Sequence, residues 1–244
     1  MKRYFFEITY RGTDYFGWQR QPKQVSIQQE LEENLSKLFS NQPIEIVGCG
    51  RTDTGVHAQQ YFFHADLPEN SADFQLVYKL NKMLSDAIVV RYIKEVNNDM
   101  HARFSAKRRT YRYFIHAQKD PFLHDRSWYY PQKLDLDKMN HAAKCMLGTR
   151  DFTSFSKLHT DVKTNICSVH KAEWKQLHDD HYYFEITADR FLRNMVRATV
   201  GTLLEVGLGK LDDTGFEKIL DAKDRGAAAV SVPAHGLFLW EIEY

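Results

Sequence analysis

The order of the predicted secondary structure limits the fold more than any other feature, because the same order occurs twice. In the first half, residues 4–10 alternate with strand period and residues 26–38 have the spacing of an amphipathic helix. The predicted strands and helices of this half cover residues 4–10, 26–38, 44–47, 57–66, 74–84 and 88–96. A strand-helix-strand-strand-helix-strand order is that of a ferredoxin-like unit.

The second half follows the same order, although it shares little sequence identity with the first. Its predicted elements cover residues 111–116, 135–147, 166–174, 182–188, 191–206 and 237–244, with an extra helix near 216–220. We therefore expect an α/β (α+β) protein of two ferredoxin-like β-α-β-β-α-β halves, residues 1–105 and 106–244, with mainly antiparallel sheets. Loops from both halves are expected to line a central basic cleft.

Charge is distributed unevenly along the chain, although the net charge is only +1. Basic residues gather in two stretches, which contain Arg103, Lys107, Arg108, Arg109 and Arg112, and Arg190, Arg193 and Arg197. A net charge near zero is compatible with a basic cleft that binds nucleic acid. The alternative is that each run of charge is a solvated face.

Cysteine usage and hydrophobicity indicate a cytoplasmic protein that does not associate with membranes. The three cysteines, Cys49, Cys145 and Cys167, form neither a disulfide framework nor a paired metal-binding motif. Glu7 interrupts the first apolar segment too early for a signal peptide, and no uncharged apolar run approaches the length of a membrane span. The sequence also lacks phosphate-binding glycine loops and zinc motifs, which favours carboxylate chemistry without a cofactor.

The most unusual stretch is residues 48–57, with the sequence GCGRTDTGVH. Its glycines permit positive φ and the close approach of another backbone, so the loop can present the carboxylate of Asp53 in a tight, exposed turn. Arg51 lies two residues earlier, and a neighbouring cation keeps a carboxylate ionised. The alternative for Asp53 is an Asx-type turn, in which the carboxylate caps its own backbone.

Aromatic and basic residues are interleaved at the start of the second half. Tyr111 and Tyr113 are expected on one face of a strand and Arg112 on the other. Such a strand suits RNA, because cations contact phosphates and aromatic rings stack on unpaired bases. The alternative is a strand with its tyrosines in the core and its arginine in water.

The loop over residues 11–22 is a second candidate for binding. It is rich in aromatic, basic and amide groups, and a loop that exposes Tyr15, Phe16 and Trp18 is more often a binding element than a simple connection. Packing in the core is an alternative for Phe16.

The third candidate is an arginine of the predicted helix over residues 191–206. Arg197 follows Arg193 by one helical turn. An arginine on the inner side of an apolar helix needs a partner, and the carboxylate of Asp53 is the candidate. The alternative is an arginine that faces outward.

Residues 50–58, with the sequence GRTDTGVHA, resemble the signature of the TruA-type tRNA pseudouridine synthases. Other segments resemble those of the family in the expected order, namely residues 12–19, 108–113, 151–155, 191–207 and 233–237. The resemblance therefore spans nearly the whole chain. The departures are small: Thr110 replaces a more basic residue, and the pair at 193–194 replaces one that is often aromatic or rich in histidine.

This resemblance implies an isomerase that converts uridine to pseudouridine in the anticodon stem-loop of tRNA, at positions 38 to 40. It implies a homodimer that uses no metal and no cofactor. By the same resemblance Asp53 is the catalytic aspartate, Tyr111 lies beside the target base, and Arg197 pairs with the aspartate. Arg51 matches the arginine associated with prising out the target base.

Other functions are compatible with the residues taken alone. A non-catalytic RNA-binding protein built from two ferredoxin-like units would bind tRNA without turnover. A hydrolytic nucleosidase would need a second acid or base, and no obvious partner carboxylate accompanies Asp53 in these motifs. Metal-dependent hydrolysis is a third alternative.

Overall fold

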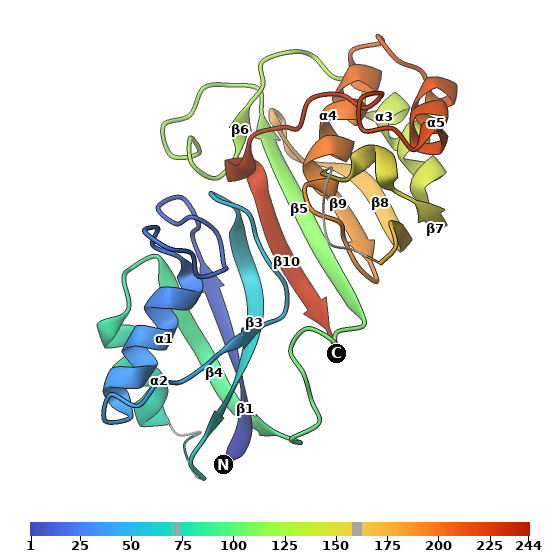
Figure 1. Cartoon of the computed structure of the whole chain (residues 1–244). Coiled ribbons are helices and arrows are strands. Elements are labelled where there is room, and N and C mark those ends of the chain that lie inside the picture. Colours follow the sequence, from blue (N-terminus) through green and yellow to red (C-terminus); the bar gives the residue numbers. More distant parts are fainter. Residues whose placement is uncertain (70, 72–73, 158–162) are drawn as a thin grey trace. The chain divides into compact units, whose positions relative to one another are not determined.

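The computed structural model describes residues 1–69, 71, 74–157 and 163–244. The chain divides into two compact units, residues 1–107 together with 238–244, and residues 108–237 (Figure 1). Each unit is a mainly antiparallel sheet with helices on one face, so the predicted α/β fold class is confirmed. Among the described residues, the helices are too short or too polar to span a membrane.

Unit 1 has the order and the strand arrangement of a ferredoxin-like unit. Its elements are β1 (Lys2–Tyr10), α1 (Ile27–Leu38), β2 (Val47–Gly48), β3 (His57–Leu67), α2 (Phe74–Met83) and β4 (Ile88–Val96). The central strand β1 is antiparallel to both β3 and β4. The short strand β2 pairs with β3, opposite His64 and Phe63.

The strands and helices of unit 1 form where the periodicity predicts them. Tyr4, Phe6 and Ile8 on β1 are fully buried, and the ring of Phe6 stacks on that of Phe63 with centroids 4.5 Å apart. The Oγ atom of Ser26 caps α1 by accepting a hydrogen bond from the Gln29 N–H at 3.2 Å. The apolar face of α1 then packs on the sheet, so this helix is fixed both at its start and along its length.

The strands of unit 2 pair in the order β5-β9-β8-β7, with β6 beside β5. Its elements are β5 (Arg108–His116), β6 (Trp128–Tyr129), α3 (Leu136–Ala143), β7 (Gly148–Asp151), β8 (Ile166–His178), β9 (His181–Ala188), α4 (Met195–Gly207) and α5 (Asp213–Ala222). The three helices lie on one face of the sheet (Figure 1) and bury Met139, Leu203 and Phe216 completely.

Several of the predicted elements have different limits in the structure. The strand predicted over 44–47 is irregular up to Ile46, and only Val47–Gly48 pairs with β3. The helix predicted over 135–147 ends at Ala143 and continues as a 3₁₀ turn. The helix predicted from 191 begins only at Met195, because Asn194 has a φ of 68° and is not helical.

Most of the last strand, β10 (Leu237–Glu243), belongs to unit 1. Phe238 and Leu239 lie parallel to the start of β3. The Lys107 N–H donates to the Glu243 carbonyl at 2.7 Å, and the Tyr244 hydroxyl donates to the Ala102 carbonyl, also at 2.7 Å. These contacts give unit 1 residues 106–107 and 238–244, whereas the sequence-based division assigned everything after residue 105 to the second half.

Candidate active site

The glycine-rich loop between β2 and β3 forms a tight turn around Asp53. The Asp53 carbonyl accepts a hydrogen bond from the Val56 N–H at 3.1 Å, and Gly55 has a φ of 76°. Asp53 itself is half-buried, and Arg51 is exposed. A hydrogen bond between backbone groups, Val56 N–H and the Asp53 carbonyl, therefore closes the turn.

Thr52 fixes the residue that precedes Asp53. Its hydroxyl shares a hydrogen bond of 2.8 Å with the hydroxyl of Tyr10, and its carbonyl accepts from the Trp18 N–H at 3.1 Å. Only 7% of Thr52 is exposed. Strand β1 and the loop that follows it therefore hold the backbone immediately before the candidate carboxylate.

Glycines allow the loop over residues 11–25 to approach the Asp53 loop closely. A Cβ atom on Gly12 would lie 2.0 Å from the Val56 carbonyl oxygen, and one on Gly17 would lie 2.4 Å from the Thr52 carbonyl oxygen. Gly17 also has a φ of 82°, which favours glycine. The two loops can pack at this distance only because neither position carries a side chain.

The aromatic residues of this loop do not all face outward, as the sequence-based interpretation expected. Tyr15 and Trp18 are buried, with 5% and 2% exposed, whereas Phe16 is 43% exposed. Trp18 stacks on Tyr61 with centroids 4.2 Å apart, and the Tyr61 hydroxyl donates to the Gly50 carbonyl at 2.5 Å. The expectation was therefore wrong for Tyr15 and Trp18, because Trp18 fills the space under the Asp53 loop.

His57 supports the same loop from its other end. It is 1% exposed, and its Nδ1 atom accepts a hydrogen bond from the Gly12 N–H at 3.1 Å. Its ring stacks on that of Phe238, with centroids 4.5 Å apart. Within the described ranges, no group of three or more His, Cys, Asp or Glu side chains is arranged to hold a metal ion.

In unit 2, Tyr111 lies on β5, half-buried, with its ring edge-on to Phe191 at a centroid distance of 4.8 Å. Tyr113, two residues on, is fully buried and donates from its hydroxyl to the Pro233 carbonyl at 2.8 Å. Arg112 forms an ion pair with the buried Glu185. The two tyrosines of β5 therefore differ: Tyr113 is a core residue, whereas Tyr111 is partly accessible.

The Arg197 side chain is held by a backbone carbonyl. Its Nε–H donates to the Val232 carbonyl at 2.7 Å, and the Val232 N–H donates to the Arg197 carbonyl at 3.2 Å. The Nδ2 group of Asn194 donates to the Ser231 Oγ at 2.5 Å. A Cβ atom on Gly201 would lie 2.1 Å from the Val230 carbonyl oxygen, so residues 230–232 run very close to α4.

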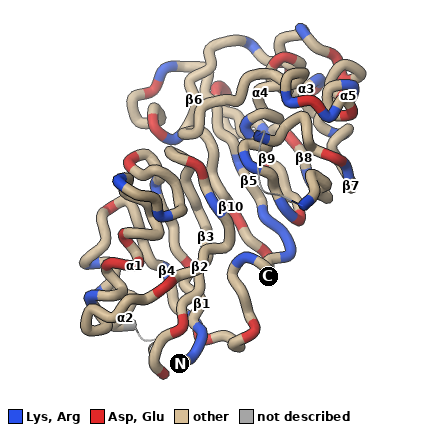
Figure 2. Tube along the Cα trace, viewed as in Figure 1, with Lys and Arg blue, Asp and Glu red and all other residues tan. Residues whose placement is uncertain are grey.

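The structure thus places Asp53 and Arg51 on one loop of unit 1, and Tyr111 and Arg197 on β5 and α4 of unit 2. The ion pair of Arg197 with Asp53 stays a prediction. Lys and Arg also gather where β5 begins (Figure 2). Sequence reasoning missed the supporting residues Thr52 and Val232, whereas the close approach of the two loops was signalled by Gly12 and Gly17.

Comparison with known proteins agrees with this arrangement of motifs. A model of the tRNA pseudouridine synthase family matches residues 8–105 and 142–244. The tRNA pseudouridine synthase A of Parabacteroides distasonis is 49% identical over 245 residues, covering 100% of this chain and 96% of the relative. That of Porphyromonas gingivalis is 49% identical over 247 residues, covering 100% and 98%. That of Bacillus licheniformis is 43% identical over 240 residues, covering 97% of each.

The chain belongs to the tRNA pseudouridine synthase family. This membership confirms the enzyme class predicted from the motifs, an isomerase that makes pseudouridine in tRNA.

Proposed function

We propose that this enzyme isomerises uridine at positions 38 to 40, in the anticodon stem-loop of tRNA, with Asp53 as its catalytic carboxylate. The observation that carries the proposal is the turn around Asp53. Hydrogen bonds fix its backbone at Thr52 and at Val56, and the chain belongs to this family of enzymes. A carboxylate on such a backbone is positioned before substrate arrives, which lowers the entropic cost of the reaction.

The reaction breaks the N1–C1′ bond of uridine, turns the base and forms a C5–C1′ bond. The C5 proton is lost and N1 gains a proton, so the change is redox-neutral. Cleavage leaves positive charge on the sugar and negative charge on the uracil. Ionised Asp53 either attacks C1′ or removes a sugar proton, and both routes use the same carboxylate.

The three other residues have roles in binding the substrate. Arg197 pairs with the carboxylate of Asp53 and orients it. Tyr111 stacks on the uracil, with its phenol available to move the C5 proton. Arg51 stabilises the RNA after the target base has left its stack, since an enzyme that acts on a base must first extract it. No cofactor or metal has a part in this scheme.

We also propose that the enzyme acts as a homodimer in the cytoplasm. Cys49, Cys145 and Cys167, which are among the described residues, form no disulfide bond, which suits a reducing compartment. Light scattering during size-exclusion chromatography tests the oligomeric state, because a dimer would have twice the 28.7 kDa mass of the chain. A monomer at micromolar concentration would contradict the dimer without affecting the chemistry.

The decisive experiment is tritium release from tRNA that carries C5-tritiated uridine, in the presence of chelator. The wild-type enzyme should release tritium while the RNA chain stays intact, and Asp53→Ala should bind tRNA with near-normal affinity and release none. Asp86→Ala, which changes an exposed aspartate between α2 and β4, is the matched control and should stay active.

Other outcomes distinguish the competing functions. Tight tRNA binding without tritium release by the folded wild-type enzyme would indicate a non-catalytic RNA-binding protein. Free uracil would indicate a hydrolase, and full activity of Asp53→Ala would remove Asp53 from the chemistry. In a tRNA with a single uridine among positions 38 to 40, replacing that uridine should abolish tritium release, and replacing a uridine elsewhere should not.

A further inference from the structure

Side-chain amides connect helix α1 to Arg51 of the Asp53 loop. The Arg51 Nε–H donates to the Oε1 atom of Gln19 at 3.1 Å. The Nε2 group of Gln19 in turn donates to the Oε1 atom of Gln28 at 2.9 Å, and Gln28 lies in the first turn of α1. We call the chain Arg51–Gln19–Gln28–Glu32 the amide relay.

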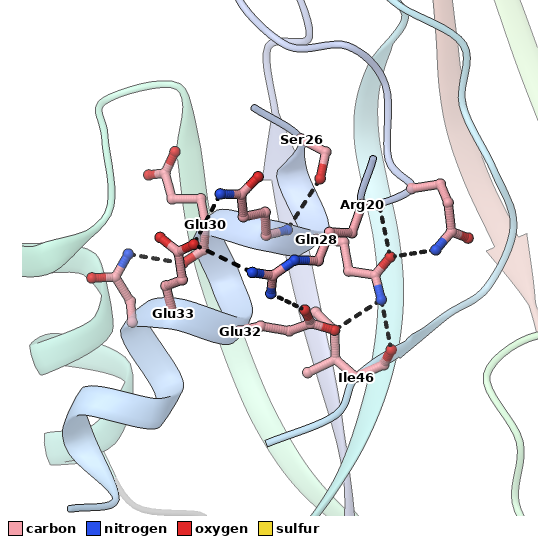
Figure 3. A network of polar contacts seen from close by, with 10 residues as sticks. Arg20, Ser26, Gln28, Glu30, Glu32, Glu33 and Ile46 are labelled. Carbon is pink, nitrogen blue, oxygen red and sulfur yellow. Dashed lines mark hydrogen bonds and ion pairs between the residues drawn. The ribbon is translucent and has the colours of Figure 1, made fainter. Parts of the chain in front are cut away.

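Gln28 lies at the centre of a network of polar contacts that includes Glu32 and Ile46, as Figure 3 shows. Its Oε1 atom also accepts from the Arg20 N–H at 3.0 Å, and its Nε2 group donates to Glu32 Oε1 at 2.8 Å and to the Ile46 carbonyl at 3.4 Å. If the oxygen and nitrogen of the Gln28 amide were exchanged, its Nε2 group would face the Arg20 N–H and the Gln19 Nε2 group, which are also donors. The Gln28 amide therefore has one orientation, and Gln19 has one orientation for the same reason.

The far end of the relay is anchored by charge and by the helix. Glu32 is only 14% exposed at its side chain, and its Oε2 atom accepts from the Arg20 Nη1 group at 3.0 Å. Helix α1 carries Gln28 and Glu32 one turn apart, and its start is fixed by the Ser26 cap. Hydrogen bonds in such a chain strengthen one another, so the relay is stiffer than one isolated bond.

We infer that Gln19 and Gln28 are positioning residues for Arg51, because they fix the plane of its guanidinium before RNA binds. The bond to Gln19 occupies one of the five N–H donors, and a guanidinium is planar, so fixing Nε directs the two terminal nitrogens. Arg51 is exposed. Without the bond to Gln19, its side chain would lose considerable conformational entropy when RNA binds. This inference rests on the proposed function, in which Arg51 stabilises the extracted base.

The test compares two neighbouring glutamines of the same helix. Gln28 and Gln29 each donate to a glutamate four residues later, Gln29 to Glu33 at 2.9 Å, but only Gln28 also contacts Gln19. Gln28→Met should slow single-turnover tritium release at saturating enzyme about tenfold, the effect of losing one positioning hydrogen bond. Its tRNA Kd should change less than about twofold, and Gln29→Met should match wild type in both measurements.

A second substrate separates positioning from a general structural defect. In a tRNA whose target uridine faces a mismatch, extraction of the base costs less. The difference between Gln28→Met and wild type should then shrink to less than about threefold, whereas a structural defect slows both substrates equally. In an Arg51→Ala background, Gln28→Met should cause no further loss.

Each outcome decides between the inference and its failure. If thermal melting shows that Gln28→Met does not fold, Gln19→Met replaces it, because Gln19 lies on a loop and carries the same bond to Arg51. Equal rates for Gln28→Met and Gln29→Met, or equal slowing on both substrates, would overturn the inference alone. Absence of tritium release by the wild-type enzyme would overturn the proposed function and this inference with it.

Discussion

The Trp18 N–H donates a hydrogen bond of 3.1 Å to the carbonyl oxygen of Thr52, one residue before the proposed catalytic Asp53. The residue before Trp18 is Gly17, whose φ of 82° turns the chain toward this oxygen. A Cβ atom on Gly17 would lie 2.4 Å from the same oxygen. The hydrogen bond of Trp18 and the lack of a side chain on Gly17 therefore together set the distance between this loop and the Asp53 loop.

Gly17→Ala should therefore impair both folding and catalysis. The added Cβ must displace the Thr52 carbonyl, and the positive φ is strained for alanine. We expect the free energy of unfolding to fall by about 2 kcal/mol or more, as measured by urea denaturation. Turnover should fall about ten- to a hundredfold, since a displacement near 1 Å is enough for such a loss.

Gly50→Ala is the control for this change. It alters a glycine of the Asp53 loop itself, but a Cβ atom there would have no heavy atom within 4 Å. Its stability should stay within about 1 kcal/mol of wild type. If both alanine variants were equally unstable, the close contact between Gly17 and Thr52 would not be the cause.

A second pair of glycines tests the packing beside Arg197. Gly201→Ala places a Cβ 2.1 Å from the Val230 carbonyl oxygen, whereas Gly207→Ala meets the flexible Met139 side chain at 2.5 Å. Both changes raise helix propensity by about 1 kcal/mol. The backbone of Val230 can move less easily than the side chain of Met139 to make room for the added Cβ. Gly201→Ala should lower the unfolding midpoint and turnover, and Gly207→Ala should do neither. Equal melting curves would contradict the rigid contact.

Buried His64 should make stability depend on pH. Burial lowers the pKa of His64 to about 4, with Arg3 and His101 adding to the effect, and its Nδ1 atom accepts from the Ala102 N–H at 3.1 Å. In the unfolded chain the pKa is about 6.5, so the unfolded state binds more protons between these values. Stability is therefore complete above about pH 6.5 and falls toward pH 4, by about 2 kcal/mol.

His64→Asn removes the titrating group but keeps an acceptor for Ala102. Its free energy of unfolding, measured by urea denaturation between pH 7 and 4.5, should depend less steeply on pH than that of wild type. Burial also lowers the pKa of His101, His116 and His235, which leaves some dependence in the variant. Asp66 has a lowered pKa through Arg3 and titrates below this range. Identical slopes would exclude His64 as a contributor.

Periodicity and local chemistry were enough to predict most elements. Strand β1 and the Ser26 cap of α1 follow from apolar spacing and a capping residue, both of which are local. The loop around Asp53 could also be located, because several glycines in a short polar stretch are uncommon in a plain connection. The limits that differ from the prediction are those without a local signal, such as the start of α4 at Met195.

The supports of the site depend on long-range contacts that leave no local signal. The carbonyl of Val232 accepts from Arg197 across 35 residues, and any residue type supplies a carbonyl. Trp18 could not be distinguished from an exposed aromatic, because its burial depends on Tyr61 of the distant strand β3. The pairing of β10 with β3 likewise joins residues far apart in the sequence, Phe238 with His57 and Leu239 with Ala58.

Tyr113 provides the last test, because its hydroxyl holds the segment that binds Arg197. The phenol donates to the Pro233 carbonyl at 2.8 Å, next to the Val232 carbonyl that accepts from Arg197. Burial raises the pKa of Tyr113 well above its usual range, partly opposed by Arg197, so the donor stays protonated. Tyr113→Phe should lower the free energy of unfolding by about 1 kcal/mol and turnover about fivefold.

Tyr182→Phe is the matched control, since it also removes a hydroxyl that donates to a carbonyl, that of Asp179 at 3.0 Å, in the turn between β8 and β9. It should leave turnover unchanged. If Tyr113 acts through Arg197, Tyr113→Phe should also have no further effect on turnover in an Arg197→Ala background. An equal proportional loss in both backgrounds would mean that Tyr113 stabilises unit 2 without positioning Arg197.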